Sequence, residues 1–301
     1  MTFKPFLLAA ALLAAPLAAH AQATPDTDPP VFKSPKIVLI GDSTTAVQGG
    51  WGPSFCGRHV TSFVACINLA RGGRSTSNYR LEGSWKLAMY EIKSGGFNDT
   101  YVLIQFGHND QPGKPGRSTD LATEFPANLK RYVDEVRAAG AKPVLVTPLT
   151  RRQFKDGKLI DDLAPWAESV RKVAAETNTP LVDLHALSTA AVQQMGPVEA
   201  MRFAQSPPDP RVKDAAKSGT TIAAAFYEPA IPGATVPPAP APAAKPAPAP
   251  AQNNAAVEPM GAPKSSFDYT HLGPEGADYF SAIVAKALAD AAPALRRQLL
   301  P

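Results

Sequence analysis

Continuous apolar runs alternate along the chain with segments whose apolar residues are spaced as on one face of a helix. The run at residues 36–40 leads directly into Gly41-Asp42-Ser43, a pattern typical of a buried strand followed by a tight turn. The segments between such runs have the spacing and the stop signals of helices. The predicted strands are residues 36–40, 64–69, 101–106, 143–147 and 180–184, and the predicted helices are residues 51–60, 85–93, 125–139, 163–177, 186–195 and 274–291.

Strand and helix alternate five times in this pattern. Strands that are apolar throughout and separated by helices indicate a parallel sheet covered on both faces. The predicted fold class is therefore α/β, a three-layer α/β/α sandwich of the doubly wound type. Ligands of such folds bind beyond the carboxyl ends of the strands. The polar, glycine-containing clusters at 41–43, 70–73 and 107–110 follow the first three strands, so we expect them to converge there.

The first residues have the composition of a targeting signal. Lys4 precedes an apolar run at 6–17, and Ala19-His20-Ala21 forms an A-x-A cleavage pattern. We expect residues 1–21 to be a signal peptide and 22–35 an extension before the domain. The mature protein would then be exported, periplasmic or extracellular, without stable membrane association. The alternative is an uncleaved N-terminal anchor.

A second unusual segment lies late in the chain. Residues 229–263 contain eleven prolines and no aromatic residue, and such Pro/Ala repeats favour extended chain and cannot bury a core. We interpret this segment as a disordered insertion within a single hydrolase domain at 36–301, because too few residues follow it for a second domain. Its role stays open.

The charge distribution and the cysteine count limit which partners and metal sites the sequence predicts. The 301 residues are 45% hydrophobic and carry a net charge of +4, with no run of Lys and Arg longer than two. This argues against a nucleic-acid partner and leaves a polyanionic substrate open. The two cysteines, Cys56 and Cys66, are too few for a zinc site. Export favours a disulfide from the first helix to the second strand, with two buried free thiols as the alternative.

Ser43 is the candidate nucleophile. It follows a buried strand, where the N-terminus of the next helix would supply a positive dipole, although a serine here can also be only a helix cap. A hydroxyl needs a base, and His271 is the best candidate because Asp268, three residues earlier, can reach its Nδ1–H. The remaining candidates are weaker: we interpret His59 as structural, His185 as a rim or capping residue and His108 as an orienting residue.

Acyl transfer also needs donors for a developing oxyanion. The candidates are the backbone N–H groups of Ser43 and Gly73 and the side-chain amide of Asn109. The alternative interpretation of Gly73 and Asn109 is an ordinary turn role.

Four short blocks hold these residues: Gly41-Asp42-Ser43, the segment 68–75, Gly107-His108-Asn109-Asp110 and Asp268-x-x-His271. In order and placement they resemble the SGNH (GDSL-type) hydrolases. The segments 105–110 and 147–152 and Thr270-His271-Leu272 are similar more narrowly to the rhamnogalacturonan acetylesterase branch. The resemblance implies a flavodoxin-like five-stranded sheet, no metal and no organic cofactor. It also implies a Ser43–His271–Asp268 triad and an oxyanion hole of Ser43, Gly73 and Asn109.

We therefore expect an exported, monomeric serine esterase that acts in pectin degradation by removing O-acetyl groups from plant cell-wall polysaccharide, with rhamnogalacturonan as the first candidate. Arg74, Arg151 and Arg152 could bind the carboxylates of an acidic polymer. The alternative is that these arginines pair with carboxylates of the protein itself. The alternatives are an acetyl-xylan or other glycan esterase, a lipase, lysophospholipase or thioesterase with the same triad, and a non-catalytic glycan-binding module. The candidate substrate-binding residues are Arg74, His108, Arg151 and Arg152.

Overall fold

The computed structural model describes residues 33–222 and 267–301. The predicted signal peptide, most of the predicted extension and the predicted insertion at 229–263 lie outside the described residues. The described elements belong to one compact unit, Lys33–Pro301. No helix in the described ranges is long and apolar enough to cross a membrane.

A five-stranded parallel sheet forms the middle layer, with strand order β2-β1-β3-β4-β7. It is the predicted α/β architecture. β1 lies next to the centre because its residues are apolar on both faces, and every residue of β1 is buried. The strands are β1 (Lys36–Gly41), β2 (Ala65–Asn68), β3 (Thr100–Gln105), β4 (Lys142–Val146) and β7 (Leu181–Val182).

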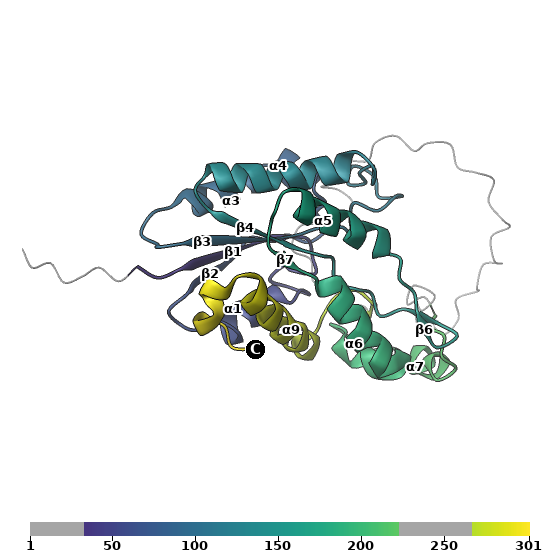
Figure 1. Cartoon of the computed structure of the whole chain (residues 1–301). Helices are drawn as coiled ribbons and strands as arrows, with labels where there is room; N and C mark the ends of the chain where they lie inside the picture. The colour runs from purple at the N-terminus through teal and green to yellow at the C-terminus, as the bar shows by residue number, and fades with distance from the viewer. Residues whose placement is uncertain (1–32, 223–266) are drawn as a thin grey trace, which may run out of the picture. The chain divides into compact units, whose positions relative to one another are not determined.

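Helices cover both faces of the sheet (Figure 1). Ile37 and Leu39 of β1 pack toward α1 and α9, while Val38 and Ile40 pack toward α3, α4 and α5, so alternate residues of one strand supply two cores. The helices are α1 (Gly52–Arg58), α2 (Asn78–Leu81), α3 (Ser84–Lys93), α4 (Glu124–Ala138), α5 (Ala164–Glu176), α6 (Leu184–Glu199), α7 (Pro210–Ala216) and α9 (Pro274–Ala291), with 3₁₀ helices η1 (Ala200–Phe203) and η3 (Pro293–Gln298).

A short antiparallel hairpin, β5 (Phe154–Lys155) and β6 (Lys158–Leu159), was absent from the predicted elements. Its turn residues Asp156 and Gly157 both have positive φ, 51° and 75°. An Asp-Gly pair is a strong signal for this type of two-residue turn, so the hairpin was detectable from the sequence.

Cys56 of α1 and Cys66 of β2 form a disulfide, with their Cα atoms 5.4 Å apart. The bond joins the first helix to the edge strand of the sheet, and it lies at the end of the strands opposite to the turn that carries Ser43.

Candidate active site

Ser43 lies in a series of turns that follows β1 at the carboxyl end of the sheet, and it is half-buried. The carbonyl of Asp42 accepts hydrogen bonds from the N–H groups of Thr45 (3.2 Å) and Ala46 (3.0 Å), which folds the chain back at this point. The helix predicted at 51–60 is α1, which begins at Gly52, and turns and bends separate it from Ser43. The prediction of a helix dipole at Ser43 was therefore wrong.

Side chains of the two neighbouring strands hold this turn in place. The side-chain oxygen of Gln105, at the end of β3, accepts hydrogen bonds from Thr45 Oγ1 and Trp51 Nε1, both at 2.6 Å. Asn68, at the end of β2, donates its amide to the Thr45 carbonyl at 2.8 Å. The role of Gln105 was not predicted, although a polar residue at the end of an apolar strand was a visible signal in the sequence.

The turn after β2 lies beside the nucleophile candidate. A Cβ atom added at Gly72 would stand 3.7 Å from Ser43 Cβ. Gly73 has a φ of 78°, a conformation that favours glycine. Within the part of the chain that the structure describes, the backbone N–H groups of Ser43 and Gly73 have no hydrogen-bond acceptor. Both N–H groups are therefore available to a substrate oxygen.

Asn109 belongs to the turn after β3 and is 6% exposed. Its side-chain nitrogen donates one hydrogen bond to the Arg74 carbonyl at 3.0 Å. An amide nitrogen carries two hydrogens, so this bond fixes the side chain and leaves the second hydrogen for another acceptor.

Asp268 and His271 form a tightly bonded pair before α9. His271 Nδ1 lies 2.8 Å from Asp268 Oδ2, and Asp268 Oδ1 accepts the N–H groups of Thr270 (2.7 Å) and His271 (2.6 Å). Burial alone would raise the pKa of Asp268, but these hydrogen bonds and the charge of His271 hold it well below its usual range. The ionised carboxylate can only accept, so Nδ1 carries the proton and Nε2 is left as a base.

The segment that carries His271 packs against the turn that carries Ser43. The N–H of Leu272 donates to the Gly49 carbonyl at 2.8 Å. Gly49 has a φ of 80°, and a Cβ added there would stand 3.1 Å from His271 Cδ2. The structure thus brings a hydroxyl, an imidazole–carboxylate pair and oriented N–H donors to one edge of the sheet, an arrangement able to transfer an acyl group.

Two of the four predicted substrate-binding residues are buried. Arg152 is 1% exposed and His108 is 2% exposed, so a polymer in solvent cannot contact either side chain, and that prediction was wrong for both. His108 Nδ1 lies 3.4 Å from Asp42 Oδ2, next to the nucleophile candidate. Burial lowers the pKa of His108 despite the opposing charge of Asp42. His108 is thus a buried neighbour of Asp42, the residue before Ser43.

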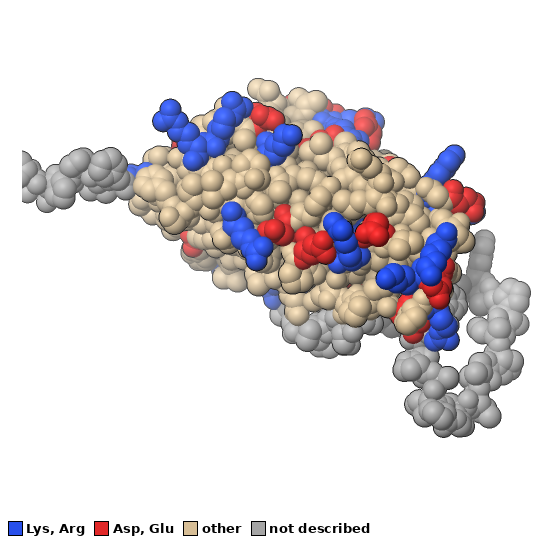
Figure 2. Space-filling model, turned by 90° about the horizontal axis from the view of Figure 1, so that it is seen from below, with Lys and Arg blue, Asp and Glu red and all other residues tan. Residues whose placement is uncertain are grey.

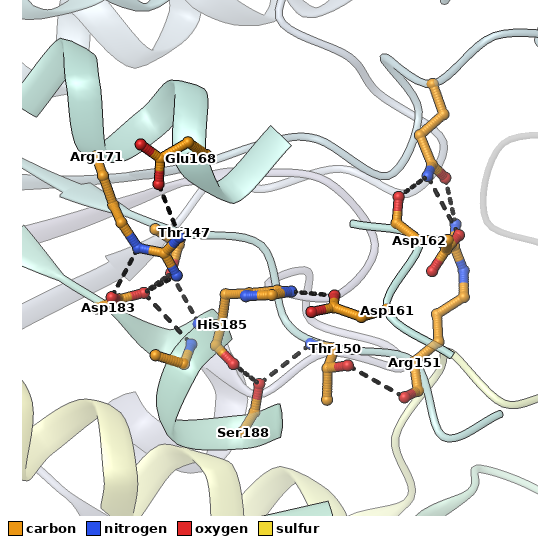
Figure 3. A network of polar contacts seen from close by, with 12 residues as sticks. Thr147, Thr150, Arg151, Asp161, Asp162, Glu168, Arg171, Asp183, His185 and Ser188 are labelled. Atoms are coloured by element: carbon orange, nitrogen blue, oxygen red, sulfur yellow. Dashed lines mark hydrogen bonds and ion pairs between the residues drawn. The ribbon is translucent and has the colours of Figure 1, made fainter. Parts of the chain in front are cut away.

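The other two predicted substrate-binding residues already pair with carboxylates. Arg74 bonds Glu82 through Nε and a terminal nitrogen, the latter at 2.7 Å. Arg151 bonds Asp162 and donates to Gln111 at 2.9 Å (Figure 3). Each arginine side chain is 13% exposed, so contact with a substrate would involve only a small part of it.

His59 lies away from this edge and bonds the Leu300 carbonyl (2.7 Å) and Asp278 (3.2 Å), which agrees with its structural interpretation. In the described ranges, no three His, Cys, Asp or Glu side chains are grouped so that they could hold a metal ion.

Comparison with known proteins identifies the family. The model of the GDSL-like Lipase/Acylhydrolase family matches residues 39–202, more than half of the chain. The matched part contains Ser43, Gly73 and Asn109, whereas Asp268 and His271 follow it.

Two curated relatives come from Bacillus subtilis. The chain is 35% identical to its probable rhamnogalacturonan acetylesterase YesY over 167 residues, which cover 53% of this chain and 75% of that protein. It is 35% identical to the rhamnogalacturonan acetylesterase RhgT over 182 residues, covering 58% and 75% of the two chains.

A solved structure supports the fold. The crystal structure of the YxiM protein of Bacillus subtilis superposes with a TM-score of 0.54 at 21% identity, over 87% of this chain and 58% of that one. This chain thus spans less than two thirds of that protein. The family match and the curated relatives agree with the arrangement around Ser43, and the chain belongs to the GDSL-like lipase/acylhydrolase family.

Proposed function

We propose that this protein is a carbohydrate acetylesterase that removes O-acetyl groups from a plant cell-wall polysaccharide, with rhamnogalacturonan as the first candidate. The observation that carries the proposal is the meeting of Ser43, the oxyanion donors and the Asp268–His271 pair at one sheet edge. Two relatives at 35% identity are named rhamnogalacturonan acetylesterases, which supports the substrate.

The mechanism follows from the polar groups at this edge. Ser43 Oγ attacks the acetyl carbonyl carbon, and its proton passes to His271 Nε2. Asp268 stabilises the imidazolium that forms, because its carboxylate already bonds Nδ1 at 2.8 Å. The N–H groups of Ser43 and Gly73 and the Asn109 amide bind the oxyanion, and each such donor contributes about 3 kcal/mol of transition-state stabilisation.

Collapse of the tetrahedral intermediate breaks the bond to the sugar oxygen. His271 returns its proton to that oxygen, which releases the deacetylated sugar hydroxyl and leaves an acetyl ester on Ser43. Water then repeats the sequence: His271 accepts its proton, the acetyl–Ser43 bond breaks, and acetate leaves.

The surface charge does not supply the substrate preference by itself. On the face that carries α6 and α9, basic and acidic side chains are interspersed (Figure 2). The net charge of +4 is therefore not gathered into one patch on that face. The proposed preference for a pectic polymer rests on the relatives rather than on a positive field.

The test is acetate release from acetylated rhamnogalacturonan, acetylated xylan and a long-chain acyl ester, for the wild type and Ser43→Ala. We expect release from the pectic polymer, with a loss of at least about 10⁴-fold in kcat for the variant. Activity that depends on Ser43 but is confined to xylan or to the acyl ester would support the triad and contradict the proposed pectic substrate. A folded protein without any hydrolysis would contradict the proposal.

We also propose export, on the basis of the charged start, the apolar run and the A-x-A pattern at residues 1–21. N-terminal sequencing of the protein recovered outside the cytoplasm is expected to begin at Gln22. A start at residue 1 would favour the uncleaved anchor instead.

A further inference from the structure

Arg152 follows the end of β4 and lies directly behind the segment that carries the proposed base. Its guanidinium donates to the carbonyl oxygens of Asp268 (3.2 Å), Thr270 (3.3 Å) and His271 (2.8 Å). Its backbone N–H donates to the carbonyl of Tyr269 at 3.0 Å. This one residue therefore binds all four carbonyl groups of residues 268–271.

The N–H groups of residues 270–273, in and just after this segment, have other partners. Those of Thr270 and His271 bond the Asp268 carboxylate. The N–H of Leu272 bonds Gly49 in the Ser43 turn, and the N–H of Gly273 bonds the Phe203 carbonyl at 2.8 Å. The segment thus has contacts to the nucleophile turn and to η1, and Arg152 is its link to the end of the central sheet.

Residues 268–271 belong to no helix or strand, so no regular backbone ladder fixes the direction of the imidazole. Arginine suits this task because its planar guanidinium presents several donors in a fixed geometry. Four carbonyl groups brought together at one place also concentrate negative partial charge, which a buried cation compensates.

We propose that Arg152 is a positioning residue that holds the Asp268–His271 pair in line with Ser43, and that it does not contact the substrate. This proposal rests on the triad of the proposed function. Arg152 acts through the backbone of residues 268–271, so its removal shifts the imidazole by changing where that segment lies.

The charge of Arg152 persists at neutral pH. Burial lowers the pKa of its guanidinium to about 10, and the charge of Asp268 opposes that shift. An apolar replacement would therefore remove both the donors and a positive charge, while lysine would retain the charge without the planar arrangement.

The chain offers a matched control at the opposite end of the sheet. Lys36, the first residue of β1, is also fully buried. It donates to the Ser94 carbonyl at 3.1 Å and to Ser94 Oγ at 2.7 Å, and it contacts the carbonyl and the carboxylate of Glu91. Lys36 is thus a buried cation that binds backbone carbonyls, as Arg152 does, but its partners lie at the C-terminal end of α3, far from the proposed triad along the strands.

The experiment compares Arg152→Met, Arg152→Lys and Lys36→Met with the wild type. We would measure melting temperature, kcat and KM for a small soluble acetate ester, and the rate at which a fluorophosphonate labels Ser43. Labelling forms a phosphorus–oxygen bond at Ser43, releases fluoride and passes the hydroxyl proton to His271. It therefore reports the Ser43–His271 alignment without depending on the natural substrate.

For Arg152→Met we expect kcat and the labelling rate to fall about 10²-fold at a temperature where the variant is folded, since a displacement of about 1 Å has such an effect. KM for the small ester stays within roughly threefold, because no substrate contact is lost. For Arg152→Lys we expect kcat and the labelling rate to fall by about tenfold. Lys36→Met is expected to melt at a lower temperature and to keep both rates within about twofold.

Equal rates in Arg152→Met and Lys36→Met would overturn the proposal, because Arg152 would then only stabilise the fold. If Arg152→Met does not fold, Arg152→Lys decides: a folded variant with wild-type rates overturns the proposal, and slowed rates support it. A wild type that is labelled at Ser43 but releases no acetate from any polysaccharide contradicts the proposed substrate and leaves this comparison decisive. A wild type that is neither labelled nor active overturns the triad and the role of Arg152 together.

Discussion

Two Asp–His pairs in this protein have the same nitrogen–oxygen distance and different surroundings. His271 Nδ1 lies 2.8 Å from Asp268, and His185 Nε2 lies 2.8 Å from Asp161. Both imidazoles are buried, at 8% and 4% exposure. An Asp–His distance therefore cannot identify a catalytic pair.

The carboxylates of the two pairs differ in their other partners. Asp268 accepts two backbone N–H groups in addition to the imidazole, whereas Asp161 accepts only His185 among the described residues. The neighbouring carboxylate, Asp162, turns away from His185 and bonds Arg151 (Figure 3).

The two histidines also differ in what packs against them. His185 is the second residue of α6, and its N–H donates to Thr147 Oγ1 at 2.7 Å. Its side chain lines an open pocket of about 530 Å³ between α6, α5 and the chain at β6. His271 packs against Gly49 in the turn of Ser43. The Asp268–His271 pair therefore differs from the Asp161–His185 pair in two ways: it packs against the turn of the nucleophile candidate, and its carboxylate is fixed by two backbone donors.

The sharpest test of this comparison exchanges each histidine for glutamine. His271→Gln should lower kcat for acetate release by at least about 10⁴-fold, since the base is removed. His185→Gln should keep kcat within about twofold. Steady-state kinetics on both folded variants would measure this, and similar losses in the two variants would mean that the pairs are not functionally different.

The carboxylates give the next largest effect. Asp268→Asn should lower kcat by about 10³-fold to 10⁴-fold, because an amide cannot hold the Nδ1–H tautomer or stabilise the imidazolium. Asp161→Asn is the matched control and should retain nearly full activity. A retained kcat in Asp268→Asn would exclude its proposed role as the orienting residue.

The stability contributed by Asp268 should depend on pH. Its pKa is lowered in the folded protein, so this contribution is complete above the unfolded pKa of about 3.9 and is lost as the pH falls through the folded value. The difference in unfolding free energy between the wild type and Asp268→Asn should therefore shrink with acidification below about pH 4. Denaturant titrations across this range would measure it, and a constant difference would contradict the assigned hydrogen bonds.

The smallest expected effect concerns the second pair. His185→Ala should lower the free energy of unfolding by about 1–3 kcal/mol, because a buried side chain and the partner of Asp161 are lost. Thermal melts of His185→Ala and Asp161→Ala would show this. Unchanged melting temperatures would mean that the pair contributes nothing to the fold.

Much of the sheet was predictable from the sequence because its strands are buried on both faces. The run at 36–40 became β1 (Lys36–Gly41) almost unchanged. The helix predicted at 186–195 ends where Gly196, with a φ of 78°, and Pro197 interrupt α6. The strand predicted at 180–184 is shorter in the structure, only Leu181–Val182, because α6 begins at Leu184.

The site was predictable where its geometry is local. Asp268 and His271 are three residues apart, so their pairing follows from chain geometry. Arg151 and Arg152 are identical in type, and only the three-dimensional structure separates them. Arg151 points to Asp162, while Arg152 points to a segment more than a hundred residues later. Such long-range contacts leave no periodic signal in a single sequence.

Residues 268–273 accept hydrogen bonds from Arg152 and donate to the carbonyls of Gly49 and Phe203, all of which come much earlier in the chain. A ribosome makes the Ser43 turn, the proposed oxyanion donors and Arg152 before it makes the proposed base, His271. The proposed triad is complete only once residues 268–273 bond the Arg152 guanidinium and the carbonyls of Gly49 and Phe203. The order of synthesis thus places the proposed base last among the groups of the proposed site.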